Sequence, residues 1–404
     1  MKSIKIAVIS DLHCHPKKND DKDNCTRLFT DLLRDEVNCH PVESFSLYYK
    51  NNKPFDCNEF DYLFCPGDVT NHSDVQGFLT GWDYVREVSQ ILNAKEIYAT
   101  LGNHDIDSRH NGSPYYLKIP KGIKKGFPIN EIEIGTFWEK GYTFIEKKDI
   151  QLLIINTTHF HTHVDKDSNP TVKGEITTGS IQEIENYLKE NSNDEKIKIM
   201  MCHHHPIQHS DMKMGAYDFI ENGEELIAVL AKYKFDLVIH GHKHYPKLKK
   251  YNTDNGTITI LSSGSFSAST QTSFINKFNY IHILEIEKNN GKCKGIVKSP
   301  NYKYQVGWEN SSDGFDFYSG FGAEKSNSAI VDEITNYTET KDPMPDWNKL
   351  CDNIEDLKFL LPIDLKEILS ELEKNQIVAV RDNSNYPKQL YNNKKLRERN
   401  NDCN

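Results

Sequence analysis

The stretch FDLVIHGHKHYP, residues 235–246, runs from an apolar segment into three alternating histidines, His240, His242 and His244. A short apolar run bounded by polar residues is typical of a buried strand. Histidine is costly to bury unless its ring nitrogens find partners. We therefore interpret the end of this strand as a candidate metal site. Gly241 would allow a tight turn, His242 and His244 would reach two different ions, and His240 would pack behind them.

Four other apolar runs, at 4–10, 62–65, 96–100 and 197–202, also end in polar residues. The sequences that follow them are DLHCH, PGD, LGNHD and HHHP. Helical periodicity between the runs, as in residues 75–92, predicts an α/β domain with largely parallel strands at first and a mixed or antiparallel second sheet later. Because ligands bind at the carboxyl ends of strands in such sheets, we expect the five polar clusters to converge.

The residue types in these clusters favour a particular metal chemistry. They offer carboxylate, imidazole and amide oxygen without thiolate, a set that suits two divalent transition-metal ions such as Mn, Fe or Zn. A pair of ions needs a carboxylate between them, and Asp68 is the lone acid at its strand end. The sequence therefore predicts two ions bridged by Asp68.

The order DLH, GD, GNHD, HHHP and GHKH resembles the signature of the calcineurin-like metallophosphoesterases over about residues 4–287. The sequence SSGS at Ser262–Ser265 also resembles the turn that follows the last metal motif in that family. The resemblance implies a four-layer αββα sandwich with mixed sheets.

The same resemblance implies roles for individual residues. It assigns Asp11, His13 and His244 to a first ion, Asn103, His204 and His242 to a second ion, and Asp68 to both. His104 would be a non-ligand beside the substrate phosphate, and Asp105 would orient it. Of the consecutive histidines we choose His204, which stands two residues before Pro206, and keep His203 as the alternate. Asn71 stands where some family members carry an iron-binding tyrosine, so a tyrosinate–iron site is not indicated.

The function that the resemblance implies is metal-dependent hydrolysis of a phosphoester, in which a hydroxide bridging the two ions attacks phosphorus. The HHHP and GNHD motifs look like those of cyclic-nucleotide phosphodiesterase and nuclease-like members. We therefore expect a phosphodiesterase that acts on a nucleotide or nucleic-acid-type substrate. The alternatives are a phosphomonoesterase or protein phosphatase, and a non-catalytic scaffold of the same fold in a multi-protein complex.

Several polar residues outside the motifs carry weaker predictions. They are His15, His72, Arg109, His159, His161 and His163. The last three alternate and could line a substrate cleft, although a polar loop or sheet edge is the interpretation we favour. His15 and His72 suit a place behind the ligands better than a contact with phosphate. Arg109 suits a phosphate oxygen and a salt bridge equally well. The long insertion at 14–60 is expected to influence substrate choice.

The bulk composition limits the remaining possibilities. A chain of 404 residues exceeds one average domain, and its net charge of −10 argues against a sequence-independent nucleic-acid binder. A phosphate substrate stays compatible because bound metal ions reverse the local sign of charge. The start MKSIKIAVISDLH has too short an apolar run for a signal peptide, and no stretch reaches the length of a membrane span. With nine cysteines in no regular spacing, we expect free thiols and a cytoplasmic protein without a membrane partner.

The apolar pattern fades after about residue 288. We predict a catalytic domain over 1–290 and a C-terminal extension over 291–404 that is partly loop-like. Residues 300–345 are rich in Asn, Ser, Gly, Tyr and Lys, and SSDGFDFYSGFG at 311–322 is a loop-like patch. Within the extension, LPIDLKEILSELEKN predicts a helix near 363–374, because Pro362 stands near its start and its leucines form one stripe. The extension is a candidate binding surface for a protein partner.

Overall fold

The computed structural model describes residues 3–16, 26–28, 37–52, 59–107, 115–123, 125–129, 134–161, 173–208, 218–269, 278–382 and 384–402. Within this part of the chain, one six-stranded sheet has the strand order β17-β14-β13-β1-β2-β3. Its strands are β1 (Ile4–Val8), β2 (Phe60–Cys65), β3 (Ala94–Ala99), β13 (His282–Asn289), β14 (Lys292–Lys298) and β17 (Tyr318–Phe321). The first three run parallel, and the last three extend the sheet beyond β1 in antiparallel pairing.

A second six-stranded sheet has the order β10-β11-β9-β7-β5-β4. Its strands are β4 (Tyr142–Glu146), β5 (Ile150–Ile155), β7 (Ile197–Met201), β9 (Leu237–His240), β10 (Lys247–Thr253) and β11 (Gly256–Ser262). The central strands β5, β7, β9 and β11 are parallel, and an antiparallel strand closes each edge. Both sheets are therefore mixed: the parallel strands form one half of the first sheet and the centre of the second.

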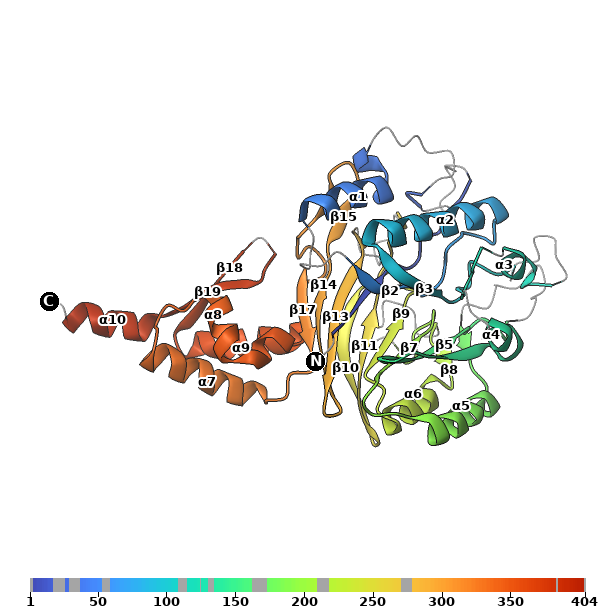
Figure 1. Ribbon diagram of the computed structural model, residues 1–404. Helices are drawn as coiled ribbons and strands as arrows, with labels where there is room; N and C mark the ends of the chain where they lie inside the picture. Colours follow the sequence, from blue (N-terminus) through green and yellow to red (C-terminus); the bar gives the residue numbers. More distant parts are fainter. Residues whose placement is uncertain are drawn as a thin grey trace.

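The two sheets lie between two pairs of helices (Figure 1). Along β7 the side chains alternate, so that Ile199 belongs to a core shared by both sheets while Met200 packs with the helices α5 (Thr178–Asn191) and α6 (Gly223–Lys232). On the other side, α1 (Pro41–Asn52) and α2 (Val75–Leu92) cover the first sheet. The predicted four-layer αββα sandwich is confirmed.

The helix α2 shows how the sequence sets an element's limits. The Asp74 side chain caps its first turn by accepting a hydrogen bond from the backbone N–H of Gly77 at 2.6 Å. Asn93 ends the helix in the left-handed conformation with φ of 51°. This helix therefore starts immediately after the loop that carries Asp68, and it holds that loop against the sheet.

Short elements complete the sandwich around these layers. They are η1 (Val37–Cys39), α3 (Lys118–Gly122), α4 (Ile134–Lys140), β6 (Gly174–Glu175), β8 (Ile220–Glu221), β12 (Asn279–Tyr280), β15 (Asn301–Lys303) and β16 (Gly307–Glu309). In the 14–60 insertion, α1 packs against β16, and Trp308 of β16 donates its indole N–H to the carbonyl of Pro41 at 2.8 Å. Part of the insertion thus belongs to the layer that covers the first sheet.

The first sheet continues beyond residue 290, which differs from the predicted domain boundary. Both β14 and β17 pair within it, so a division at 290 would cut a hydrogen-bonded sheet. The polar region 300–345, expected to be partly loop-like, also contains β15, β16, β17 and the whole of the helix α7 (Asn327–Thr340). These strands could not be predicted from the sequence because they are short and rich in polar and glycine residues.

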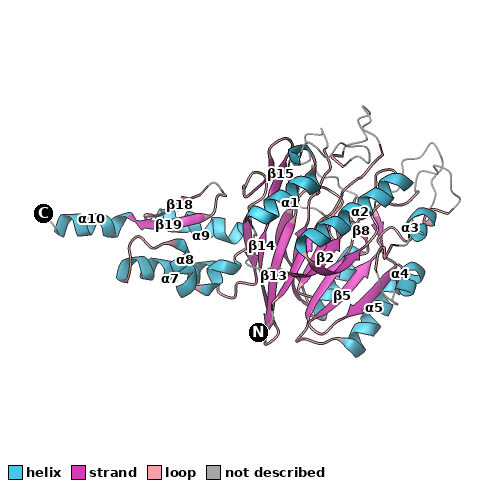
Figure 2. Ribbon diagram, turned by 45° about the horizontal axis from the view of Figure 1, so that its top comes forward, coloured by secondary structure: helices cyan, strands magenta, loops and turns pink. Residues whose placement is uncertain are grey.

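A C-terminal unit with its own apolar core follows β17 (Figures 1 and 2). Its elements are α7, α8 (Trp347–Asn353), η3 (Glu355–Phe359), α9 (Pro362–Lys374), β18 (Ile377–Arg381), β19 (Pro387–Asn392) and α10 (Asn393–Asp402). The helix predicted near 363–374 corresponds to α9. The unit is joined to the edge of the first sheet, where Gly320 donates its N–H to the carbonyl of Leu360 at 2.9 Å. Among the helices of the described ranges, none has the length and apolarity that crossing a membrane requires.

Candidate metal centre

Five of the predicted metal ligands have a backbone conformation that side chains rarely adopt. Their φ angles are 53° at Asp11, 50° at His13, 53° at Asp68, 80° at His242 and 53° at His244. Such residues cost roughly 1–3 kcal/mol each and tend to cluster at functional sites. The turns that follow β1, β2 and β9 are therefore strained at the positions where sequence places the ligands.

Asp11, His13 and His244 form the first ligand group. The Nε2 atoms of His13 and His244 lie 2.9 Å apart, and Nε2 of His244 lies 3.3 Å from Oδ1 of Asp11. All three residues are buried. Two nitrogen ligands at roughly 2.1 Å from one ion and at right angles to each other would be about 3 Å apart. The spacing of this group therefore fits one shared metal ion.

Asp68, Asn103, His203 and His242 form the second ligand group. Nε2 of His203 lies 3.2 Å from Oδ2 of Asp68 and 3.3 Å from Oδ1 of Asn103. His242 offers a ring nitrogen within 4.8 Å of ligand atoms of Asp68 and His203. Oδ2 of Asp68 also lies 3.5 Å from Nε2 of His13 in the first group. Asp68 therefore stands between the two groups, where a bridging carboxylate would have to be.

The structure places His203, and not the predicted His204, in the second group. Past the end of β7 the two rings are nearly perpendicular, with an interplanar angle of 86°. Nδ1 of His203 bonds to the carbonyl oxygen of Pro66 at 2.8 Å, which turns Nε2 toward Asp68. Nδ1 of His204 instead bonds to Oγ1 of Thr157 at 2.7 Å. The spacing of His204 from Pro206 did not reveal which histidine faces Asp68, because consecutive side chains project to different sides.

His104 and Asp105 of the GNHD motif have different surroundings. The half-buried His104 ring stacks edge-on against His13 at 4.6 Å between centroids, beside both ligand groups. The Asp105 carboxylate accepts hydrogen bonds from the backbone N–H groups of Asp68, Thr70 and Gly102 at 2.8–3.0 Å. Asp105 was predicted to orient His104, and these three bonds also make its carboxylate hold the loop that carries Asp68.

Comparison with known families agrees with this geometry. Residues 4–246 match the family described as calcineurin-like phosphoesterase. The chain belongs to the calcineurin-like phosphoesterases. The match ends just after His244, so it includes every residue of both ligand groups. No curated protein matches the chain in sequence.

Several solved structures are similar to this chain. A dimetal phosphatase from Danio rerio is 11% identical, with 74% of this chain and 99% of that chain covered and a TM-score of 0.46. A purple acid phosphatase from yellow lupin (Lupinus luteus) seeds is 16% identical, with 79% of this chain and 53% of that chain covered and a TM-score of 0.48. A Vps29 protein from Cryptosporidium parvum is 10% identical, with 79% and 98% covered and a TM-score of 0.32.

The protonation states of these phosphoesterase residues suit metal binding. Burial lowers the pKa of His13 to about 4 and that of His242 to about 3, so both rings are neutral at pH 7. Burial would raise the pKa of Asp68, but His203 and His104 hold it well below its usual range. Nε2 of His242 is buried and makes no hydrogen bond within the described part of the chain. A buried lone pair of this kind is what a metal ion would satisfy, so the residues fit two divalent ions.

Two other polar residues singled out in the sequence, His72 and His161, lie near this centre. His161 is buried, its Nε2 bonds to the carbonyl of Lys173, and its ring lies 5.7 Å from that of His204. It therefore belongs to a layer behind the ligands. The His72 ring lies 5.5 Å from that of His104. Arg109 and His163 lie outside the described residues.

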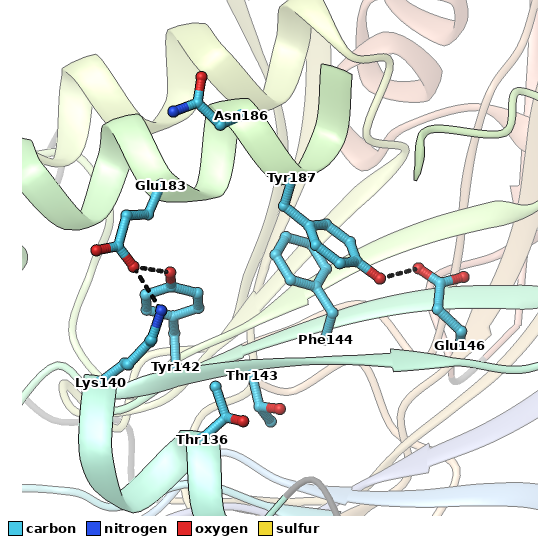
Figure 3. Close-up of a pocket in the computed structure, with 9 residues that line it drawn as sticks. All are labelled: Thr136, Lys140, Tyr142, Thr143, Phe144, Glu146, Glu183, Asn186 and Tyr187. Carbon is cyan, nitrogen blue, oxygen red and sulfur yellow. Dashed lines mark hydrogen bonds and ion pairs between the residues drawn. The ribbon is translucent and has the colours of Figure 1, made fainter. Parts of the chain in front are cut away.

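A hollow away from the metal centre lies between β4, α4 and α5 (Figure 3). Its ionic groups pair with neighbours on its own walls. Lys140 bonds to Glu183 at 2.9 Å, and the Tyr187 hydroxyl donates to Glu146 at 3.3 Å. The Phe144 and Tyr187 rings stack at 4.0 Å. These pairs account for the charged groups that line the hollow.

Proposed function

We propose that this protein is a two-metal phosphoester hydrolase. The observation that carries the proposal is the position of Asp68, whose carboxylate lies 3.5 Å from His13 of the first ligand group and 3.2 Å from His203 of the second. In this assignment Asp11, His13 and His244 hold one ion, Asn103, His203 and His242 hold the other, and Asp68 holds both. His203 replaces His204 because its Nε2 faces the shared carboxylate.

Two bound divalent ions would supply Lewis acidity toward a phosphoryl oxygen and a water of lowered pKa. The chain's own residues fix where this happens. The backbone N–H of His242 donates to both carboxylate oxygens of Asp11, at 3.0 and 3.2 Å, and so holds that side chain in place. The backbone N–H of His104 donates to Oδ1 of Asp68 at 2.8 Å, which leaves Oδ2 for the ligand groups.

His104 is the proposed catalytic residue. Its ring is half-buried and adjoins His13, so a substrate phosphate at the ligand groups would meet it. An imidazolium there would stabilise negative charge on the phosphoryl oxygens and could give a proton to the leaving oxygen. Asp105 acts as a positioning residue, because it fixes the backbone of the loop that carries Asp68.

The substrate class we propose is a phosphodiester of nucleotide type. The resemblance of HHHP and GNHD to the motifs of cyclic-nucleotide phosphodiesterases supports this choice. The net charge of −10 makes a short nucleotide a better candidate than a long nucleic acid, because a long polyanion is bound through a basic surface.

The test is hydrolysis by Mn²⁺-loaded protein of bis-p-nitrophenyl phosphate and of p-nitrophenyl phosphate, followed by cyclic and linear nucleotides. We expect the diester to be the better substrate and chelation to abolish its hydrolysis. A preference for the monoester would overturn the substrate class and leave the two-metal hydrolase standing. Protein that holds two ions and hydrolyses none of these esters would favour the non-catalytic scaffold.

A further inference from the structure

The six residues SSGSFS, Ser262–Ser267, cross from the end of β11 in the second sheet toward the first sheet. We name them the serine segment, and we propose that this segment positions the ligands of the first metal ion. Ser265 is the positioning residue, and it acts through Asp11. The inference rests on the proposed function, since it assumes that Asp11, His13 and His244 hold an ion.

The serine segment holds the two loops that supply the first ligand group. Its four hydroxyls donate to backbone carbonyls: Ser262 to Tyr245 at 2.7 Å, Ser263 to His240 at 2.8 Å, Ser265 to Asp11 at 2.6 Å and Ser267 to Leu12 at 2.7 Å. All four serines are buried. Two bonds hold the loop of His242 and His244, and two hold the loop of Asp11 and His13. The segment therefore ties together ligands that come from different sheets.

A glycine and two backbone N–H groups aim the Ser265 hydroxyl. Gly264 has φ of 64°, and a Cβ there would meet Pro246 at 3.2 Å and Tyr280 at 3.3 Å, so the turn needs glycine. Oγ of Ser265 accepts from the N–H groups of Ala268 at 2.8 Å and Ser267 at 3.3 Å. Because its acceptor positions are used in this way, the single hydroxyl proton is left for Asp11.

The Asp11 carbonyl depends on Ser265 more than the neighbouring carbonyls depend on their serines. The carbonyl of Leu12 also accepts from Oγ1 of Thr26 at 2.9 Å, and that of His240 also accepts from the N–H of Ser263 at 2.8 Å. For the Asp11 carbonyl, the described residues provide the Ser265 hydroxyl as donor. Since Asp11 has a strained φ of 53°, loss of this bond would let its peptide turn and move its carboxylate away from His13 and His244.

The test is Ser265→Ala, measured by titration of metal-free protein with Co²⁺, with calorimetry for the two affinities and visible absorption for the identity of the site. Variants of the ligands themselves, His244→Ala and Asn103→Ala, give the spectra of protein that has lost the first or the second ion. We expect Ser265→Ala to weaken binding of the first ion by about 10–100-fold and to leave the second nearly unchanged. If Ser265→Ala does not fold, Ser265→Cys keeps the size of the side chain with a poor donor.

Ser267→Ala is the matched control, because it removes a neighbouring hydroxyl whose acceptor keeps Thr26 as a donor. Its effect on the binding of either ion should be much smaller than the effect of Ser265→Ala on the first ion. Equal weakening of both ions by Ser265→Ala, or the same weakening by Ser267→Ala, would mean a general structural role and would overturn the inference. If Ser265→Ala binds both ions normally, the inference about Ser265 is overturned and the proposed function stands. If the unchanged protein binds no Co²⁺, both the inference and the proposed function are overturned.

Discussion

The two ends of β7 bury ionisable groups in opposite ways. At its start, the fully buried Lys198 has an acceptor for each ammonium proton, namely Ser192 at 2.6 Å, Asp194 at 2.9 Å and the carbonyl of Tyr233 at 2.7 Å. Just past its end, Nε2 of His203 faces the carboxylate of Asp68 at 3.2 Å, and Nε2 of the neighbouring ligand His242 is buried and makes no hydrogen bond within the described residues. At the first end the protein itself supplies hydrogen-bond partners for the buried ammonium group. At the second end the set of partners is incomplete, which is how a ligand site differs from a structural network.

The start of β7, where the buried ammonium of Lys198 is fully hydrogen-bonded, also joins the two sheets. Oδ2 of Asp236, which precedes β9, accepts from the ammonium of Lys288 in β13 at 2.8 Å and from the backbone N–H of Lys198 at 2.8 Å. The metal end joins the same two sheets through ligands from both. One end of β7 therefore contributes to stability, while the other combines strained turns, neutral imidazoles and a shared carboxylate, the features of the proposed metal site.

The largest effect is expected from Asp68→Ala. It should remove both ions and reduce diester hydrolysis by at least about 10⁴-fold, because Asp68 is the ligand proposed for both ions and the ions supply several kcal/mol of transition-state stabilisation. Metal content and initial rates measure this. The control is Asp61→Ala at the opposite end of the same strand, where Asp61 pairs with Lys95 at 3.0 Å. Retention of both ions and full activity by Asp68→Ala would contradict the bridging role.

His104→Ala separates metal binding from catalysis. It should keep both ions and lose about 10²–10⁴-fold in rate, the usual contribution of a general acid. The loss should be larger for an alkoxide leaving group than for p-nitrophenolate, which hardly needs a proton. Equal losses for the two leaving groups would make His104 an electrostatic stabiliser, and loss of an ion would make it a ligand.

Asp236→Ala tests the first side of the comparison, the start of β7. Without this carboxylate the buried ammonium of Lys288 loses its charged partner and keeps the carbonyl of Lys196, so we expect the free energy of unfolding to fall by about 3–5 kcal/mol while both ions still bind. Urea denaturation of metal-free protein and a Mn²⁺ titration measure the two parts. Asp194→Ala removes a half-exposed acid of the same network and should destabilise less. A loss of metal affinity in Asp236→Ala would mean that the two ends are not independent.

His282 is a buried histidine outside the proposed metal site. It tests whether a histidine whose two ring nitrogens both have protein partners serves stability rather than metal binding. Its ring nitrogens bond to Oγ of Ser299 and to the carbonyl of Ser263, both at 2.7 Å, and burial lowers its pKa to about 4. Below pH 6.5 the unfolded chain binds a proton here that the folded protein does not, so stability falls as pH falls from 6.5 toward 4. By pH 5 the loss is about 2 kcal/mol.

The measurement for His282 is the free energy of unfolding of metal-free protein between pH 7 and pH 5, compared with His282→Gln. The amide of glutamine can donate to Ser263 and accept from Ser299 without titrating. The advantage of the unchanged protein should therefore shrink by about 2 kcal/mol over this range. Parallel pH dependences in the two proteins would show that His282 does not titrate as its buried ring requires.

Sequence was sufficient for the parallel strands and for the motifs at their ends. Asp11, Asp68 and Asn103 directly follow apolar runs, and in an α/β fold the ends of adjacent parallel strands must meet. The choice between His203 and His204 was not available from sequence, because it depends on how the chain turns after Met201 and on the distant carbonyl of Pro66.

Long-range pairing explains the other differences. The strands β14 and β17 join the first sheet through β13, which pairs with β1 some 280 residues earlier in the chain, as in Ile4 opposite Ile286. No local pattern encodes such a partner. Likewise, GNHD indicated a role for Asp105 toward His104, but not that Asp105 also accepts from the backbone N–H groups of Asp68 and Thr70 in another loop.

We propose that two ions lie at the carboxyl ends of β1, β2, β7 and β9, with Asp68 between them. Anomalous diffraction from crystals of Mn²⁺-loaded protein tests this proposal most directly. We expect two anomalous peaks roughly 3.5–4 Å apart, both in contact with Asp68, with His203 on the second ion and His204 still bonded to Thr157. A single peak, two peaks that do not share Asp68, or a second ion held by His204 in place of His203 would contradict the proposal.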